Sequence, residues 1–200
     1  GNNLSLHLLE LFTSQVAKVG MTDGIRQVLQ EESDALRAYY EQAGILIARP
    51  AGGTSCRLAI SAKGGTNAEN HNHNDVGSYA VALGSETMVG DQGGPVHQGV
   101  AGFGIHQLGK SFGHPVPVVD GRTQSSGGKA KGVVLQKEFT NEKDVFSIDY
   151  TSAYSTPNLD KLIRTFVYDR QGEGNFTVGD EFTAKTPIRF ETAITTRADW

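Results

Sequence analysis

Hydrophobic and polar positions follow two different periods along this chain, and the change comes near residue 43. Over residues 4–19 the leucines and Phe12 recur at helical spacing, and a second helical stretch is expected at about residues 23–40. Gly20 lies between the two stretches and is suited to end the first of them. The sequence therefore predicts two consecutive helices before residue 43.

Beyond that point the chain consists of short strand-like runs separated by Gly, Pro, Asn and Asp. The runs predict strands at residues 45–48, 56–61, 77–83, 87–90, 116–119, 133–139, 145–150, 162–169, 175–181 and 188–196. Many short strands at this spacing are typical of an antiparallel β-sandwich and not of a parallel α/β sheet. We therefore expect a mainly β fold, with residues 1–42 as a helical segment and residues 43–200 as the β domain.

Composition narrows the classes of partner. The 200 residues are 38% hydrophobic and 20% charged, and the formal net charge is −4. A chain this mildly acidic has no general attraction for nucleic acid or for an anionic membrane surface. It has no run of 18 apolar residues, so membrane insertion is not expected. The single cysteine, Cys56, excludes an intramolecular disulfide and a multi-cysteine zinc site.

Histidines are distributed unevenly, since five of the six fall within residues 71–114. His71 and His73 are two residues apart, which places both side chains on one face of an extended strand about 7 Å apart. Asp91, at the end of a predicted strand, is the best nearby carboxylate, and Asp75 competes for the same role. Imidazoles with a carboxylate are typical zinc ligands, so the pattern predicts a divalent-metal site, with zinc as the expected metal.

Two known motifs match this region in part. The first cupin motif, G-x5-H-x-H, fits from Gly65 to His73, but the glutamate that should follow is absent and no second cupin motif is found. The metallo-β-lactamase motif HxHxDH fits from His71 to Asp75, but Val76 occupies the position of the last histidine. A cupin-like metal-dependent enzyme therefore stays open as an alternative, as does a non-catalytic carbohydrate-binding β-sandwich.

A third similarity extends over most of the chain. Its segments, in order, are QAGILIAR at residues 42–49, KGGTNAENHNHNDVGSY at 63–79, VGDQGG at 89–94 and FGHPVPVVDG at 112–121, followed by RTFVYDR, VGDEF and FETAITTR. On these segments the chain resembles the C-terminal β-sandwich region of the heparinase II/III-like polysaccharide lyases. The resemblance implies a supersandwich-like β domain, truncated at its C-terminus, and makes residues 1–42 the tail of a missing (α/α) toroid domain.

The resemblance also implies roles for particular residues. A structural zinc is held in that family by residues that correspond to His73, Asp91 and His114. The first histidine of the pair, His71, would face the cleft and help to neutralise the substrate carboxylate. His97 stands where relatives usually carry a tyrosine, and it is a candidate catalytic residue.

Three further side chains are candidates for binding the sugar: Asn70, Asn72 and Arg122. The asparagine that relatives carry after the last zinc histidine is replaced here by Pro115. The expected partner is an acidic polysaccharide or oligosaccharide, and a second copy of the chain (a homodimer) is a further candidate.

The activity implied is β-elimination at a uronic acid in the bacterial periplasm or outside the cell. In that reaction the carboxylate beside C5 is neutralised, a base removes the C5 proton and an acid protonates the leaving oxygen. The base and acid of the family come largely from the toroid. We therefore expect the 200-residue chain alone to be inactive.

Overall fold

A computed structural model describes residues 35–69, 72–90 and 110–196, and this part of the chain is almost entirely β. In chain order its elements are β1 (Arg37–Tyr40), β2 (Ile45–Ala48), β3 (Leu58–Lys63), β4 (Gly65–Asn67), β5 (Tyr79–Leu83), β6 (Glu86–Val89), the 3-10 turn η2 (Ser111–Gly113), β7 (Val118–Val119), β8 (Gly127–Phe139), β9 (Lys143–Asp149), the 3-10 turn η3 (Thr151–Ala153), β10 (Leu159–Asp169), β11 (Asn175–Ala184) and β12 (Phe190–Glu191).

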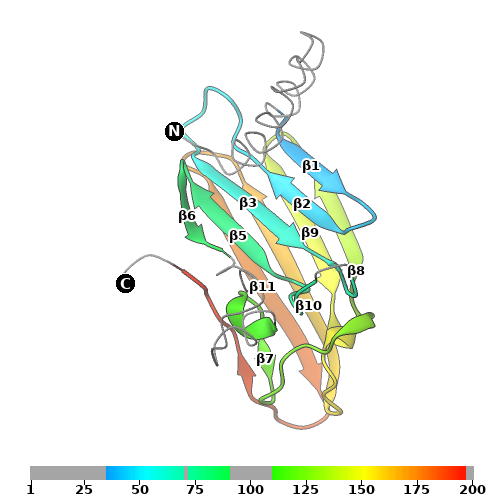
Figure 1. Ribbon diagram of the computed structural model, residues 1–200. Coiled ribbons are helices and arrows are strands. Elements are labelled where there is room, and N and C mark those ends of the chain that lie inside the picture. Colours follow the sequence, from blue (N-terminus) through cyan, green and yellow to red (C-terminus); the bar gives the residue numbers. More distant parts are fainter. Residues whose placement is uncertain (1–34, 70–71, 91–109, 197–200) are drawn as a thin grey trace, which may run out of the picture.

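The strands form two five-stranded sheets, with orders β1-β2-β3-β5-β6 and β11-β10-β9-β8-β4, and a small pair of β12 with β7. Every strand pairing in the described residues is antiparallel. Figure 1 shows the first sheet in front of the second, in the two-layer arrangement of a β-sandwich. The mainly β, antiparallel fold predicted from the strand-like runs is confirmed.

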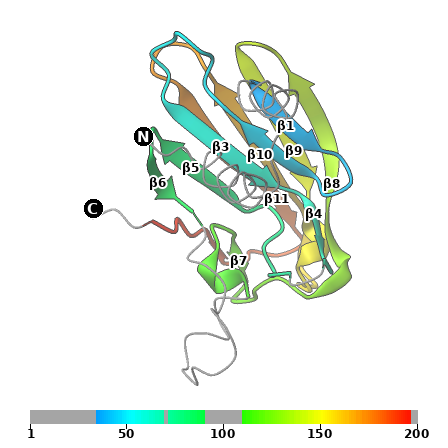
Figure 2. The same cartoon turned by 45° about the horizontal axis from the view of Figure 1, so that its top comes forward.

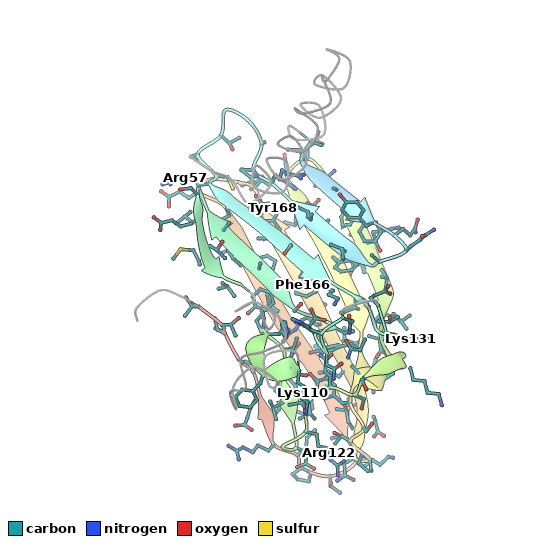
Figure 3. All side chains as sticks on the ribbon, viewed as in Figure 1. Arg57, Lys110, Arg122, Lys131, Phe166 and Tyr168 are labelled. Atoms are coloured by element: carbon teal, nitrogen blue, oxygen red, sulfur yellow. The ribbon has the colours of Figure 1, made fainter. Side chains whose placement is uncertain are left out.

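The core lies between the two sheets and follows the period of two along β10. Leu162, Arg164, Phe166 and Tyr168 of this strand are buried, and Ile163, Thr165 and Val167, which alternate with them, are more exposed. The Phe166 ring stacks on Phe146 of β9, with ring centroids 6.0 Å apart. Burying each such side chain stabilises the fold by about 1.5–3 kcal/mol. Figure 3 labels Phe166 and Tyr168 where the two sheets overlap in the view.

The first strand corrects one prediction. The helix expected at residues 23–40 is wrong over Arg37–Tyr40, which form β1 and pair with β2. Tertiary packing explains the difference: the Tyr39 ring makes edge contacts with Phe139 and Phe146, at centroid distances of 5.6 and 5.8 Å. In the strand, the backbone of Tyr39 pairs with β2 while its ring lies in this aromatic cluster. The sheet thus begins within the part assigned to the helical segment, and residues 35 and 36 before it are not helical. Residues 4–19 and 23–34 of the two predicted helices lie outside the described residues.

Several strand limits also differ from expectation. The strand predicted at residues 188–196 is only Phe190–Glu191, and that predicted at 56–61 is Leu58–Lys63. β8 starts at Gly127, earlier than predicted, and the short β4 was not predicted at all. These two differences have one cause, because β4 pairs with the first part of β8. Gly-rich stretches carry no apolar alternation, so only their partner strand shows that they are extended.

Close backbone approach at two turns requires glycine. Gly65 has a left-handed φ of +66°, and a Cβ on it would lie 2.5 Å from the Ala43 carbonyl oxygen. Gly44, in the β1–β2 turn, has a φ of +62°, and a Cβ on it would lie 2.7 Å from the Gly65 nitrogen. The turn therefore packs directly on the start of β4, which fixes where the chain enters the β4–β5 connection.

The connections that carry His73 and His114 lie at one end of the two layers. They are the β4–β5 connection and the segment from η2 to β7, which are neighbours in both Figure 1 and Figure 2. Within residues 35–69, 72–90 and 110–196, no helix has the length and apolar character needed to cross a membrane.

Candidate metal centre

Two histidines from distant parts of the chain meet at this end of the sheets. His73 lies in the β4–β5 connection and His114 directly follows η2. Nδ1 of His73 lies 3.1 Å from Nε2 of His114, and the ring centroids are 5.1 Å apart. His114 is 1% exposed, so its ring is held by the protein on almost every side.

The separation of the two nitrogens suits a shared metal ion. Two nitrogens bound tetrahedrally to zinc, each about 2.0–2.1 Å from it, lie about 3.3–3.4 Å apart. The 3.1 Å between His73 and His114 needs only a small adjustment to reach this value. The donor chemistry is equally suitable, since neutral imidazole is a preferred zinc ligand. Among the described residues no group of three or more His, Cys, Asp or Glu side chains forms a metal cluster.

The loop that carries His73 is tied down by a lysine on β3. Nζ of Lys63 lies 2.5 Å from a carboxylate oxygen of Asp75 and donates to the Asn72 side-chain oxygen at 3.2 Å. Ser78 closes the turn, because its backbone N–H donates to the Asp75 carbonyl at 2.9 Å. The Asp75 carboxylate is therefore engaged by Lys63 beside the histidine pair, in keeping with a supporting role.

A buried glutamine holds the same loop from the other side. Gln124, 4% exposed, donates through Nε2 to the Val76 carbonyl at 2.7 Å, and its Oε1 accepts from the Val76 N–H at 3.0 Å. The Asn67 side chain donates to the same Oε1 at 3.0 Å. The amide thus pairs with both backbone groups of Val76, as a neighbouring strand would. Each of these bonds satisfies a buried polar group that would otherwise be costly.

Ser111 joins the two histidine segments directly. Its hydroxyl donates to the Asn74 carbonyl at 2.8 Å and accepts from the Gln124 N–H at 2.9 Å. Ser111 is 2% exposed and is the first residue of η2. Because Asn74 follows His73 and η2 precedes His114, this one hydroxyl helps to set the two rings against each other.

A groove of about 230 Å³ lies beside this centre. Its walls come from the strands β2, β3 and β5 and from the segment after η2, and they comprise Ile45, Ser61, Ala62, Lys63, Ser78, Tyr79, Ala80, His114 and Pro115. The lining is mostly apolar, with Lys63 as its cation. Burial is the main cause that raises the pKa of Tyr79 above its ordinary value, so this phenol stays protonated at neutral pH.

The remaining predicted site residues lie either away from the histidine pair or outside the described residues. Arg122 is exposed in the turn after β7, at the lower end of Figure 3, and donates to the Ser155 carbonyl at 3.2 Å. Asn72 contacts Lys63 as described above. Asn70, His71, Asp91 and His97 lie outside the described residues, so their proposed roles stay predictions, as does zinc binding itself.

Solved structures share this arrangement of strands. The heparan sulfate lyase HepC from Pedobacter heparinus matches with a TM-score of 0.65 at 17% sequence identity, over 92% of this chain and 28% of that one. A heparinase III gene product matches with a TM-score of 0.66 at 12% identity, over 91% and 28% of the two chains. A heparinase III structure matches with a TM-score of 0.57 at 17% identity, over 75% and 23%. The chain has a heparinase-like fold.

The extent of this likeness is limited in two respects. The chain spans between 23% and 28% of the length of those lyase structures, and identities of 12–17% relate the folds alone. No protein-family model matches the chain, and the search of curated proteins returned no match. What the comparisons establish is a heparinase-like fold, shared with polysaccharide lyases.

Sequence reasoning did not identify three residues that support the segments carrying His73 and His114. They are Lys63, Gln124 and Arg164. Arg164 had a detectable signal, because it occupies an inward position in the alternation of β10, between Leu162 and Phe166. A charged residue at such a position needs a buried partner. Lys63 and Gln124 carried no such signal, since polar residues at a strand end or in a loop are common.

Proposed function

We propose that this chain is the β-sandwich part of a polysaccharide lyase that cleaves uronic-acid-containing glycans by β-elimination. We also propose that it binds one structural zinc ion through His73, Asp91 and His114. The observation that carries the proposal is the contact of His73 with His114, at 3.1 Å, on a fold shared with heparan sulfate lyase and heparinase III structures. The third ligand, Asp91, rests on the family resemblance.

The zinc is proposed to be structural. When bound, it would cross-link the β4–β5 connection to the segment after η2. Elimination at a uronic acid needs a neutralised carboxylate, a base and an acid, and it needs no metal-bound hydroxide. Residues of this chain would supply the neutralisation: His71 in the first place, with Asn70 and Asn72 beside it.

The substrate class proposed is an acidic glycan, with a glycosaminoglycan as the leading candidate because structural neighbours include a heparan sulfate lyase. Arg122 is exposed and carries a charge of the right sign for such a chain. His97 is proposed to stand near the reacting sugar, at the position of the tyrosine in relatives. Its imidazole could exchange a proton near neutral pH.

The proposal extends to the rest of the protein. Residues preceding β1 would be the end of an (α/α) toroid domain that brings the catalytic base, and the lyase would act in the periplasm or outside the cell. The catalytic cleft would then form between the toroid and the end of the sheets that carries the histidines. A homodimer is the assembly to test first.

The test compares the 200-residue chain with the longer protein that includes a toroid. Each is incubated with heparan sulfate, and the ultraviolet absorbance of the unsaturated uronate is followed. We expect product with the longer protein and none with the 200-residue chain, and zinc analysis should find one ion per chain in both. Glycan binding by the longer protein without unsaturated ends would overturn the lyase assignment in favour of a non-catalytic carbohydrate-binding protein.

A further inference from the structure

Arg164 on β10 is a buried cation at the centre of the molecule. It is 1% exposed, and its neighbours in the inward alternation of the strand are apolar. Its Nε donates to Asp180 of β11 at 2.8 Å and its Nη2 donates to the other carboxylate oxygen at 2.7 Å. Burial by itself disfavours the charged guanidinium, but the hydrogen bonds to Asp180 raise the pKa of Arg164 above its ordinary value. The cation is therefore permanent.

The remaining nitrogen of Arg164 points to the candidate metal centre. Nη1 donates to the Gly77 carbonyl at 2.9 Å and to the Pro115 carbonyl at 2.8 Å. Gly77 belongs to the connection that carries His73, and Pro115 directly follows His114. One nitrogen thus binds the backbone of both histidine segments, and the planar guanidinium fixes its direction.

Two tyrosines complete the surroundings. Tyr150 donates its hydroxyl to Asp180 at 2.9 Å, and the guanidinium lies 5.7 Å from the centroid of its ring. The ring of Tyr79 lies on Arg164 at 5.8 Å. These contacts fix the orientation of the guanidinium, so residues of the core strands set the position of Nη1.

We propose that Arg164, oriented by Asp180, is the positioning residue that sets His73 and His114 at metal-binding distance by holding the carbonyls of Gly77 and Pro115. Ser111 and Gln124 connect the same two segments locally. Arg164 instead anchors both segments to β10, in the sheet β11-β10-β9-β8-β4. The inference rests on the proposed metal site for its functional meaning, but the anchoring itself is testable without metal.

A second arginine, Arg170, directly follows β10 and provides a matched control. Arg170 is 3% exposed and pairs with buried Asp144, with Nη2 2.5 Å from the carboxylate. It also donates to two backbone carbonyls, those of Arg49 at 2.7 Å and Leu36 at 3.1 Å. Arg164 and Arg170 are therefore alike in burial and pairing, and they differ in which segments they anchor.

The experiment compares Arg164→Lys with Arg170→Lys in the full 200-residue chain. Lysine keeps the charge against the aspartate but has three donors on one atom and cannot reproduce the guanidinium geometry. The first readout is amide hydrogen exchange, without metal, in residues 72–78 and 111–116. The second is the affinity for zinc, measured by competition with a chromophoric chelator.

In Arg164→Lys we expect the amides of both segments to exchange at least about tenfold faster than in the wild type, because two hydrogen bonds are lost. Zinc affinity should fall by about 10–100-fold, the usual effect of removing a residue that orients metal ligands. Arg170→Lys should leave both readouts within about twofold of the wild type.

Unchanged exchange in both segments of folded Arg164→Lys, with zinc affinity within about twofold of the wild type, would overturn the inference. Absence of zinc binding by the wild type would instead refute the metal site, while hydrogen exchange would still decide the anchoring role. If Arg164→Lys does not fold, the apolar pair Arg164→Met with Asp180→Leu takes its place, with the same expected results. Failure of both to fold, when Arg170→Lys folds, would also overturn the inference, since Arg164 would then be a determinant of folding.

Discussion

Nδ1 of His73 lies 3.1 Å from Nε2 of His114, although the two residues are 41 positions apart in the chain. Neither residue is in a strand, so the contact depends on how two connections are held at the end of the sheets. Lys63, Gln124 and Ser111 hold them locally. The contact is therefore a property of the assembled fold, and its chemistry can be tested residue by residue.

The two histidines of the HNHND segment should behave differently. We expect His73→Ala to lose the bound zinc and to lower the midpoint of thermal unfolding, because a ligand that cross-links two segments stabilises the folded state. We expect His71→Ala to retain the zinc and to lose activity in the longer protein. Metal content of the purified variants, with differential scanning calorimetry, is the measurement. Equal loss of zinc from both variants would show that the division of roles is wrong.

Gln124→Leu should destabilise the fold by about 3 kcal/mol. The substitution removes the amide and leaves the N–H and carbonyl of Val76 buried without their partner. Urea unfolding followed by fluorescence gives the free energy of unfolding. The control is Gln171→Leu, at an exposed glutamine whose side chain contacts Glu142, which should change stability by less than about 0.5 kcal/mol. Similar values for the two variants would contradict the role given to Gln124.

Gly65→Ala should cost more stability than Gly53→Ala. Both glycines have a left-handed φ, +66° and +76°, and this strain alone costs an L-residue about 1–2 kcal/mol. A Cβ at Gly65 would also lie 2.5 Å from the Ala43 carbonyl oxygen, whereas one at Gly53 meets nothing within 4 Å. We expect a total of about 3 kcal/mol or more for Gly65→Ala. Equal midpoints of urea unfolding would show that the close approach is not present.

Alkaline pH should unfold the protein through its buried tyrosines. Burial is the main cause that raises the pKa of Tyr150, Tyr154 and Tyr168 well above the ordinary value near 10. In the unfolded chain these phenols ionise near pH 10, so above that pH the unfolded state binds fewer protons than the folded state. Their contribution to stability is thus complete below about pH 10 and is lost as the pH rises further.

The measurement is a spectrophotometric titration of tyrosinate, alongside the free energy of unfolding at each pH. Between pH 10 and the pH at which the protein unfolds, the native protein should show less tyrosinate than the same chain in urea. Identical titration curves for native and urea-unfolded protein would contradict the burial of these phenols.

Much of the fold could be predicted because its strands are patterned by a local rule. Runs such as those of β9 and β10 alternate inward and outward residues, and alternation alone indicates strands that pack on one face. The concentration of histidines likewise marked the region of the site. The helix predicted at Arg37–Tyr40 was wrong because the local pattern contains no information on distant residues. Phe139 and Phe146, about 100 positions along the chain, pack against Tyr39 in the sheet.

By itself, the sequence determined most of the extended segments beyond residue 43, the residues chemically able to bind a metal and, through its resemblance, the family to compare. The resemblance implied that His73 and His114 share a metal ion, but only the tertiary structure gave their contact and the binding of Arg164 to the carbonyls beside both. The physical reason is that alternation and composition act between neighbours in the chain. The separation of two loops depends instead on long-range hydrogen bonds to buried side chains, whose partners appear only when the two sheets have packed.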